Sequence, residues 1–193
     1  MKRQDVAVLY VDPLGPYPRL VHHWYDATRD ARTYDGPWPV VAHAPCGPWS
    51  SLRSLSRETT KDAAPHALAV VRRWGGVLEH PCGSLLFREY RMPFPGELPD
   101  GFGGVTVEID QCDWGHVARK RTWIYVVGCR ELPPMPARRR PTHWCSGGGT
   151  GRGRTPPGIK VCSAQQRRRT PPAFAAWLLE LAARCSRKPR NGS

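Results

Sequence analysis

Short apolar segments, each closed by a turn of proline and glycine, most strongly limit what this chain can fold into. Residues 6–11 read Val-Ala-Val-Leu-Tyr-Val and stop at Asp-Pro-Leu-Gly-Pro, and residues 39–43 stop at Ala-Pro-Cys-Gly-Pro. Residues 77–79 form a third, shorter run before His-Pro-Cys-Gly. Continuous apolar runs of this length are typical of buried strands, and no helix continues through such turns. The sequence therefore predicts several short strands inside a sheet that is covered on both faces.

Helical and hairpin patterns alternate with these strands. A helix is expected over residues 62–74, with Pro65 in its first turn and Gly75 and Gly76 after its end, and a second helix over 83–90. Residues 105–110 alternate apolar and polar side chains, and with the strand 122–128 they predict a β-hairpin. A last helix is expected from Thr170, with Pro171 at its first position. This order predicts an α/β fold of the Rossmann type, with one mostly parallel sheet and helices on both faces.

Chain length and cysteine use narrow the class further. The 193 residues suffice for one α/β core and are too few for two full domains. The N-terminal region lacks an apolar stretch of signal-peptide length, and no segment reaches the length of a membrane span. The seven cysteines are odd in number and irregularly spaced, unlike a secreted disulfide framework. We therefore expect a cytoplasmic protein without a membrane partner.

Basic residues are concentrated in the last third of the chain. Residues 130–193 contain 14 Lys and Arg against two Glu, whereas residues 1–129 contain 15 basic and 14 acidic side chains. This asymmetry is typical of a protein that binds a polyanion such as DNA, although a GC-rich genome also enriches arginine. We expect a body over 1–129, a basic Pro/Gly/Arg-rich arm over 130–168, a docking helix over 169–186 and a basic tail over 187–193.

Cys46 is the first candidate for chemistry. It follows a strand within the loop 45–50, Pro-Cys-Gly-Pro-Trp-Ser, which places it at the carboxyl edge of the sheet, where open α/β folds form their sites. A helix beginning near Ser50 is expected to lower the pKa of the thiol through its dipole. The competing interpretation is a buried, inert cysteine.

Glu79 is the second candidate, at the tip of a very short strand. A carboxylate in that place is costly to bury without a function, and Glu79 can serve as a general acid if its surroundings raise its pKa. The alternative is a Glu that caps the following helix. The basic triplet Arg119, Lys120 and Arg121 comes just before the strand 122–128 and can hold a phosphate or a base carbonyl.

These segments, in this order, resemble motifs of the DNA (cytosine-5) methyltransferases. The loop 45–50 is similar to the family's Pro-Cys-Gln-x-Phe-Ser, and the Glu-His-Pro at 79–81 is similar to its Glu-Asn-Val. The Trp-Gly at 114–115, followed by Arg-Lys-Arg and a strand ending in Gly128, resembles its aromatic-Gly turn before Gln-x-Arg-x-Arg. Residues 169–174 are similar to its late Arg-x-Leu-Thr-Pro segment. The resemblance spans roughly residues 6 to 185 and implies a methyltransferase-like sheet in a compact, truncated, phage-like enzyme.

The resemblance implies a transfer of a methyl group from S-adenosylmethionine to C5 of a cytosine that is rotated out of DNA. The Cys46 thiolate adds to C6, Glu79 contacts N3 and the exocyclic amine, and Arg119 or Arg121 holds the O2 side or a phosphate. No metal is implied. The expected cofactor residues are Asp12, Gly15, Asp26, Asp30 and Pro45. The expected DNA contacts are Trp49, Ser50, Lys120, Arg138, Arg139, Arg140, Arg152, Arg154, Arg167 and Arg168. Trp49 either stacks on the base or packs beneath its loop, and His43 and His80 flank the nucleophile and the acid.

The chain also departs from this family. The glycine-rich first motif that receives S-adenosylmethionine is absent, with Gly15 as the one glycine in its place, and the arm stands where a large target-recognition region is expected. Three alternatives therefore stay open: a base-modifying enzyme with another one-carbon donor, a non-catalytic DNA-binding protein, and a zinc module. The candidate zinc ligands are His143, Cys145, Cys162 and Cys185.

Overall fold

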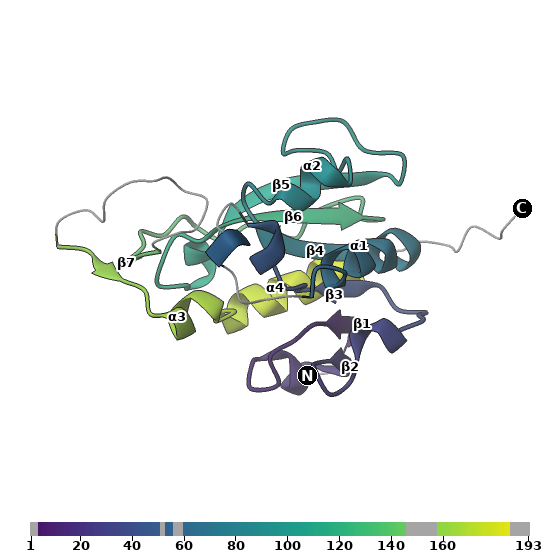
Figure 1. Cartoon of the computed structure of the whole chain (residues 1–193), viewed down its shortest axis with the longest axis horizontal. Helices are drawn as coiled ribbons and strands as arrows, with labels where there is room; N and C mark the ends of the chain where they lie inside the picture. Colours follow the sequence, from purple (N-terminus) through teal and green to yellow (C-terminus); the bar gives the residue numbers. More distant parts are fainter. Residues whose placement is uncertain (1–3, 51–52, 56–59, 146–157, 186–193) are drawn as a thin grey trace, which may run out of the picture.

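The computed structural model of the chain describes residues 4–50, 53–55, 60–145 and 158–185. Its central sheet has six strands in the order β2-β1-β3-β4-β6-β5. The strands are β1 (Gln4–Leu9), β2 (Val21–Tyr25), β3 (Val40–Ala42), β4 (Gly76–Pro81), β5 (Gly104–Asp110) and β6 (Arg121–Val127). The first four are mutually parallel, and β6 lies antiparallel to both β4 and β5 (Figure 1). The predicted mostly parallel sheet with a β5–β6 hairpin is confirmed.

Two helices cover opposite faces of this sheet. Along β1, Val6 and Val8 pack in one core with α4 (Pro172–Ala183), whereas Ala7 and Leu9 pack in the other with α1 (Ala63–Trp74). This division follows from the period of two in a strand, because neighbouring side chains point to opposite faces. Each fully buried leucine of these cores contributes about 1.5–3 kcal/mol by leaving water. The predicted helices on both faces are therefore confirmed.

The connection from α1 to β4 depends on two glycines. Gly75 ends α1 with a φ of +81°, and Gly76 begins β4 with a φ of +114°. A Cβ on Gly76 would collide with the backbone of Val40 in the neighbouring strand β3. Glycine is required here both by the left-handed backbone and by the close approach of the two strands. The turn thereby fixes the register of β4, which carries Glu79.

Several elements differ from the sequence-based expectation. The strand β2 was not predicted, because it is an edge strand in which two histidines interrupt the apolar pattern. The connections β1–β2 and β2–β3 contain only the 3-10 turns η1 (Tyr17–Arg19) and η2 (Ala31–Thr33). The short helix α2 (Leu85–Glu89) lies within the predicted range, and α4 begins at Pro172, with Pro171 in the capping position expected for Thr170.

The described part of the basic arm is more ordered than its composition predicts. It contains β7 (His143–Trp144) paired with β8 (Lys160–Val161), and α3 (Ala164–Arg168). A further bridge joins His143 to Ala118, in the connection from β5 to β6. Figure 1 shows β7 and α3 at the end of the molecule where α4 begins. These residues of the arm therefore form regular elements that a Pro/Gly/Arg-rich composition does not predict.

Among the helices that the structure describes, none has the length and apolar character needed to cross a membrane.

Candidate active site

The order in which the chain adds strands to the sheet reverses between β1 and β3, because β2 lies on one side of β1 and β3 lies on the other. In open α/β sheets, ligands bind outside the carboxyl ends of the strands at such a point. The residues that follow β3, from His43 to Cys46, lie at this edge. Glu79, one residue beyond the Ala42–Leu78 pair of β3 and β4, lies at the same edge. The structure thus brings the predicted Cys46 and Glu79 segments together.

A chain of hydrogen bonds crosses this point of the sheet. The phenolic oxygen of Tyr17 lies 2.6 Å from Nε2 of His43, and Nδ1 of His43 lies 3.1 Å from Oε2 of Glu79. Both contacts are satisfied when the Tyr17 hydroxyl donates to Nε2 and the Nδ1–H of His43 donates to Glu79. Burial and the charge of Glu79 raise the pKa of Tyr17 well above 10, so its hydroxyl stays protonated. Tyr17 therefore fixes the orientation of the His43 ring.

The other oxygen of Glu79 is held by Gln111, in the 3-10 turn η5 (Gln111–Trp114) that follows β5. Nε2 of Gln111 donates to Oε1 of Glu79 at 3.0 Å and to Oγ1 of Thr122 at 3.0 Å. The Gln111 side chain is buried, and its Oε1 has no hydrogen-bond partner in the described structure. Neither Gln111 nor Tyr17 was singled out from the sequence. The only signal was a polar residue directly after the alternating strand 105–110.

These contacts keep Glu79 ionised. Burial alone would raise its pKa, but the hydrogen bond from His43 and the charge of Lys120 outweigh burial and lower the pKa to about 2. The general acid expected from the sequence, with a raised pKa, is therefore wrong: this carboxylate accepts hydrogen bonds. The alternative role as a helix cap is also wrong, because Ser84 caps α2 by accepting from the N–H of Leu86. The Glu79 side chain remains 15% exposed, so it can still reach a ligand.

Cys46 lies within the electrostatic reach of Glu79. Burial raises the pKa of its thiol, the carboxylate of Glu79 raises it further, and Lys120 and Arg168 act in the opposite direction. Where the structure describes the residues around Ser50, they form the 3-10 turns η3 (Gly47–Trp49) and η4 (Arg53–Leu55) and no α-helix. The predicted lowering of the thiol pKa by a helix dipole is therefore wrong. In the free protein Cys46 is a protonated thiol at neutral pH. The positive charges of Lys120 and Arg168 favour its thiolate form.

Lys120 has an unusual backbone conformation. Its φ is +42°, in the left-handed region that few residues other than glycine adopt, and such conformations concentrate at functional sites. Its charge favours the ionised forms of both Glu79 and Cys46. No described residue accepts a hydrogen bond or ion pair from its ammonium group. Of the predicted basic triplet, Lys120 is the member whose charge acts on both Glu79 and Cys46.

His80, next to Glu79 in sequence, points into the opposite core. It is fully buried, its Nδ1 lies 2.8 Å from Oγ of Ser84, and its Nε2 has no partner in the described structure. Burial lowers the pKa of His80 to about 4, so the ring is neutral near pH 7. Its hydrogen bond to Ser84 orders the turn after β4.

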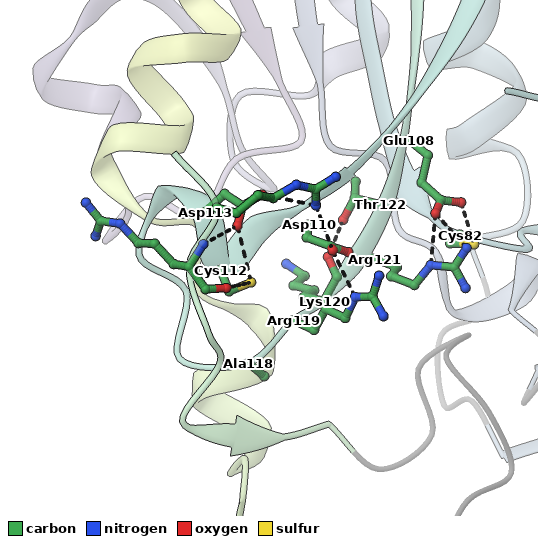
Figure 2. A network of polar contacts seen from close by, with 12 residues as sticks. Cys82, Glu108, Asp110, Cys112, Asp113, Ala118, Arg119, Lys120, Arg121 and Thr122 are labelled. Atoms are coloured by element: carbon green, nitrogen blue, oxygen red, sulfur yellow. Dashed lines mark hydrogen bonds and ion pairs between the residues drawn. The ribbon is translucent and has the colours of Figure 1, made fainter. Parts of the chain in front are cut away.

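The arginines that flank Lys120 pair with carboxylates of β5, as Figure 2 shows. Arg121 donates from Nε and Nη2 to Glu108 at 3.0 and 2.6 Å, and Arg119 donates to Asp110 at 2.8 Å. Arg138 of the arm also reaches Asp110, at 3.2 Å, and Asp113, at 3.4 Å. The sequence assigned these three arginines to a base or to phosphates. In the structure, each already has an anionic partner within the protein.

Trp49 packs beneath its loop. It is 1% exposed, its ring meets that of Tyr90 edge-on, and the ammonium of Lys61 lies over it at 5.2 Å. Stacking of Trp49 on a base is therefore excluded in this conformation, and its assignment as a DNA contact was wrong. The hydroxyl of Ser50 donates to the carbonyl of Gly47 at 3.1 Å and helps to close the same turn.

The three aspartates expected to hold S-adenosylmethionine make contacts within their own turns. Asp12 accepts from the backbone N–H of Leu14, Asp26 accepts from Thr28 and Arg29, and Asp30 caps η2 and pairs with Arg32. A Cβ on Gly15 would lie 3.0 Å from the carbonyl oxygen of Asp12, so this glycine serves the local turn. Tyr17 is 3% exposed and hydrogen-bonds to His43. Pro45 is half-buried beside Cys46.

Helix α3 brings exposed arginines to the site. Ser163 and Gln166 form a capping box at its start, which explains a helix in so polar a segment. Nε2 of the buried His116 lies 2.9 Å from the carbonyl oxygen of Gln166 and ties α3 to the body. The predicted DNA contacts Arg167 and Arg168 are exposed on this helix, and the charge of Arg168 acts to lower the pKa of Cys46. Arg139 and Arg140 are also exposed, whereas Arg152, Arg154 and the basic tail lie outside the described residues.

The candidate zinc ligands are not gathered. Cys145 and Cys162 contact each other at the ends of β7 and β8, but Cys185 contacts Cys129 instead. Within the described ranges, no three His, Cys, Asp or Glu side chains are placed to hold a metal ion.

Comparisons with known proteins add no relative to this description. No model of a protein family matches the chain, and searches of the curated proteins and of the solved structures found no match either.

Proposed function

We propose that the protein modifies pyrimidine bases in DNA, with Cys46 adding to C6 of a cytosine that has been rotated out of the helix. The observation that carries the proposal is the meeting of Cys46 and Glu79 at the carboxyl edge of β3 and β4, where His43 joins the two segments. The motif resemblance of loop 45–50 and of Glu79 to the DNA (cytosine-5) methyltransferases supports the choice of base.

The chain's own residues suffice for the activation step. The Cys46 thiol gives its proton to water, and the thiolate sulfur then bonds to C6 while water supplies a proton to N3. The electron pair of the former C5–C6 double bond moves between C4 and C5 and makes C5 nucleophilic. The ionised Glu79 stabilises the proton on N3 and accepts from the 4-amino group, an interaction that is strongest once the adduct has formed. Lys120 favours the thiolate. Water can then protonate C5, the original C5 hydrogen and the N3 proton return to water, and the C6–S bond breaks to release the thiolate and restore the C5–C6 double bond.

DNA is the proposed partner because α3 and the arm carry exposed arginines, and the charge of one of them, Arg168, acts on Cys46. Arg168, Arg139 and Arg140 can neutralise backbone phosphates, and Arg121 and Arg119 keep the adjoining β5–β6 edge rigid through their carboxylate partners. S-adenosylmethionine is the methyl donor that the resemblance implies. Since the residues expected to bind it are engaged elsewhere, the proposal ends at the activated base.

One further observation favours a second candidate. The engagement of Asp12, Asp26 and Asp30 in local turns is also expected of a non-catalytic DNA-binding protein that kept the fold. The experiment that separates the two needs no donor: DNA of mixed sequence labelled with tritium at C5 of cytosine is incubated with the protein, and tritium release to water is counted. We expect release by the wild type and none by Cys46→Ser. Equal release by both proteins, or none by either, would contradict the proposed activity.

A further inference from the structure

We propose that Gln111 and the Tyr17–His43 pair are positioning residues that make Glu79 select a pyrimidine with a 4-amino group over one with a 4-oxo group. The inference rests on the proposed function, because it concerns the base that Glu79 would meet. It goes beyond that function by giving three residues, none of which belongs to the motifs described above, a role in distinguishing one base from another.

The geometry leaves Glu79 with one kind of interaction to offer. His43 donates to Oε2 at 3.1 Å, and Gln111 donates to Oε1 at 3.0 Å, so each carboxylate oxygen already has a donor. A carboxylate held in this way is an acceptor only. A ligand can therefore satisfy it by presenting a donor, such as an amine or a protonated ring nitrogen.

The two supporting residues are themselves held in one orientation. The amide of Gln111 is fixed by its second hydrogen bond, to Oγ1 of Thr122, and the Thr122 hydroxyl in turn donates to the carbonyl of Lys120. This chain of donors forces the NH₂ end of Gln111 toward Glu79 and leaves the amide oxygen without a partner. His43 is oriented from its far side by Tyr17. Neither donor can turn away without losing a buried hydrogen bond.

The bases differ at the group that this carboxylate would meet. Cytosine carries an amine at C4, whereas thymine and uracil carry the acceptor O4. An ionised carboxylate placed against O4 sets two acceptors against each other in a partly dry site, which costs more than a mismatch in water. Against cytosine the same carboxylate accepts from the amine and, once Cys46 has added, from the protonated N3. The arrangement therefore favours cytosine in both binding and reaction.

The inference predicts a change of base preference when Gln111 becomes a second carboxylate. In Gln111→Glu the two carboxyl groups face each other, and such pairs share a proton because both cannot ionise at that distance. A shared proton provides a donor for O4. Removing the donor without adding a charge, as in Gln111→Met, should loosen Glu79, and Tyr17→Phe should do so through His43.

The test measures tritium release from C5 of cytosine and of uracil in otherwise identical DNA, over a range of pH, for the wild type and the three variants. We expect Gln111→Glu to shift the cytosine-to-uracil rate ratio at least tenfold toward uracil. Gln111→Met and Tyr17→Phe should lower kcat by on the order of tenfold with KM for DNA nearly unchanged. A merely structural role would alter neither the ratio nor the split between kcat and KM.

A second readout does not depend on activity. The chain contains seven glutamates, so side-chain carboxyl ¹³C labelling and NMR can follow each one, with the Glu79 signal assigned from Glu79→Gln. The titratable groups that face or flank Glu79 are His43, His80, Lys120, Cys46 and Tyr17. We expect the pKa of Glu79 to rise in Gln111→Glu, Gln111→Met and Tyr17→Phe, and to stay low in the exposed control Gln165→Glu.

The two readouts separate the inference from the function on which it rests. If the wild type releases no tritium while the NMR titrations behave as expected, the base-modifying activity is wrong and the positioning of Glu79 stands. If the wild type acts on cytosine but the variants change neither the base preference nor the Glu79 titration, the inference is overturned and the proposed function survives.

Discussion

The guanidinium of Arg138 lies 3.2 Å from the carboxylate of Asp110, and this contact joins the basic arm to the sheet. Asp110 is 10% exposed and Asp113, the second partner, is 8% exposed, whereas the Arg138 side chain is 81% exposed. The nearby backbone N–H of Arg139 donates to Asp113 at 2.9 Å. The arm therefore has a structural role as well as a charge.

The first prediction follows from this contact. Arg138→Ala should lower the free energy of unfolding by about 1 kcal/mol, because two largely buried carboxylates lose a partner. The loss stays small because water screens the exposed guanidinium of Arg138. Arg140→Ala, which removes an exposed arginine of the same arm, should leave the stability unchanged. Urea unfolding measures both, and equal stability of the two variants would show that the arm is not docked through Arg138.

The second prediction concerns DNA binding by exposed arginines. Replacing Arg139 and Arg140 by Ala should weaken binding to all duplex sequences alike. The slope of log affinity against log salt should become flatter by about 0.9 for each phosphate contact that is lost. Fluorescence anisotropy at several salt concentrations measures this slope. An unchanged slope would contradict phosphate contacts by Arg139 and Arg140.

The third prediction concerns the reactivity of Cys46. Because the pKa of its thiol is raised, alkylation by iodoacetamide should accelerate about tenfold per pH unit from pH 7 to 9. Lys120→Gln removes a charge that favours the thiolate, so the rate at pH 8 should fall severalfold, whereas Lys160→Gln in the exposed strand β8 should not change it. Peptide mass spectrometry follows Cys46 among the seven cysteines. A rate independent of pH would contradict the protonated thiol.

The fourth prediction is a loss of stability in mild acid. The pKa of His80 is about 4 in the folded protein and about 6.5 when unfolded, so the unfolded chain binds more protons between these values. Stability is therefore full above about pH 6.5 and is lost as the pH falls toward 4. From pH 7 to 5 the loss should reach about 2 kcal/mol.

The control for this prediction replaces an exposed histidine. Urea unfolding of His23→Gln should show the same loss between pH 7 and 5, since His23 lies on the outer strand β2, while His80→Gln should show a smaller one. If His80→Gln keeps the full dependence on pH, other histidines, such as the buried His116, are its source.

The strands and turns could be predicted from sequence because a strand that is buried on both faces requires a continuous run of apolar residues. The apolar runs at 6–11 and 39–43 and their proline-rich turns place Cys46 at the sheet edge without any structure. The edge strand β2 has no such run, since its exposed face tolerates His22 and His23. Helix α3 was missed because a capping box and the contact with His116, and no apolar face, hold it in place.

The site was predicted only in part for a related reason. Cys46 and Glu79 follow recognisable strands, so their position suggested chemistry. Tyr17 and Gln111 help to determine the hydrogen bonding and ionisation of Glu79. They lie 62 and 32 positions from Glu79 along the chain, Tyr17 in a proline-rich turn and Gln111 in a 3-10 turn. Hydrogen bonds over such separations depend on how β1, β4 and β5 are arranged. Periodicity in one segment carries no information about them.

The formation of a bond between Cys46 and a base is the central claim, and one measurement tests it most directly. The protein is incubated with a pool of duplexes in which 2-pyrimidinone, an electrophilic base without the 4-amino group, replaces one cytosine within randomised flanks. Denaturing electrophoresis and peptide mass spectrometry then detect a covalent complex and locate its site. We predict a complex with the wild type, attached at Cys46, and none with Cys46→Ser. No complex with either protein, or attachment at another cysteine in both, would contradict the account.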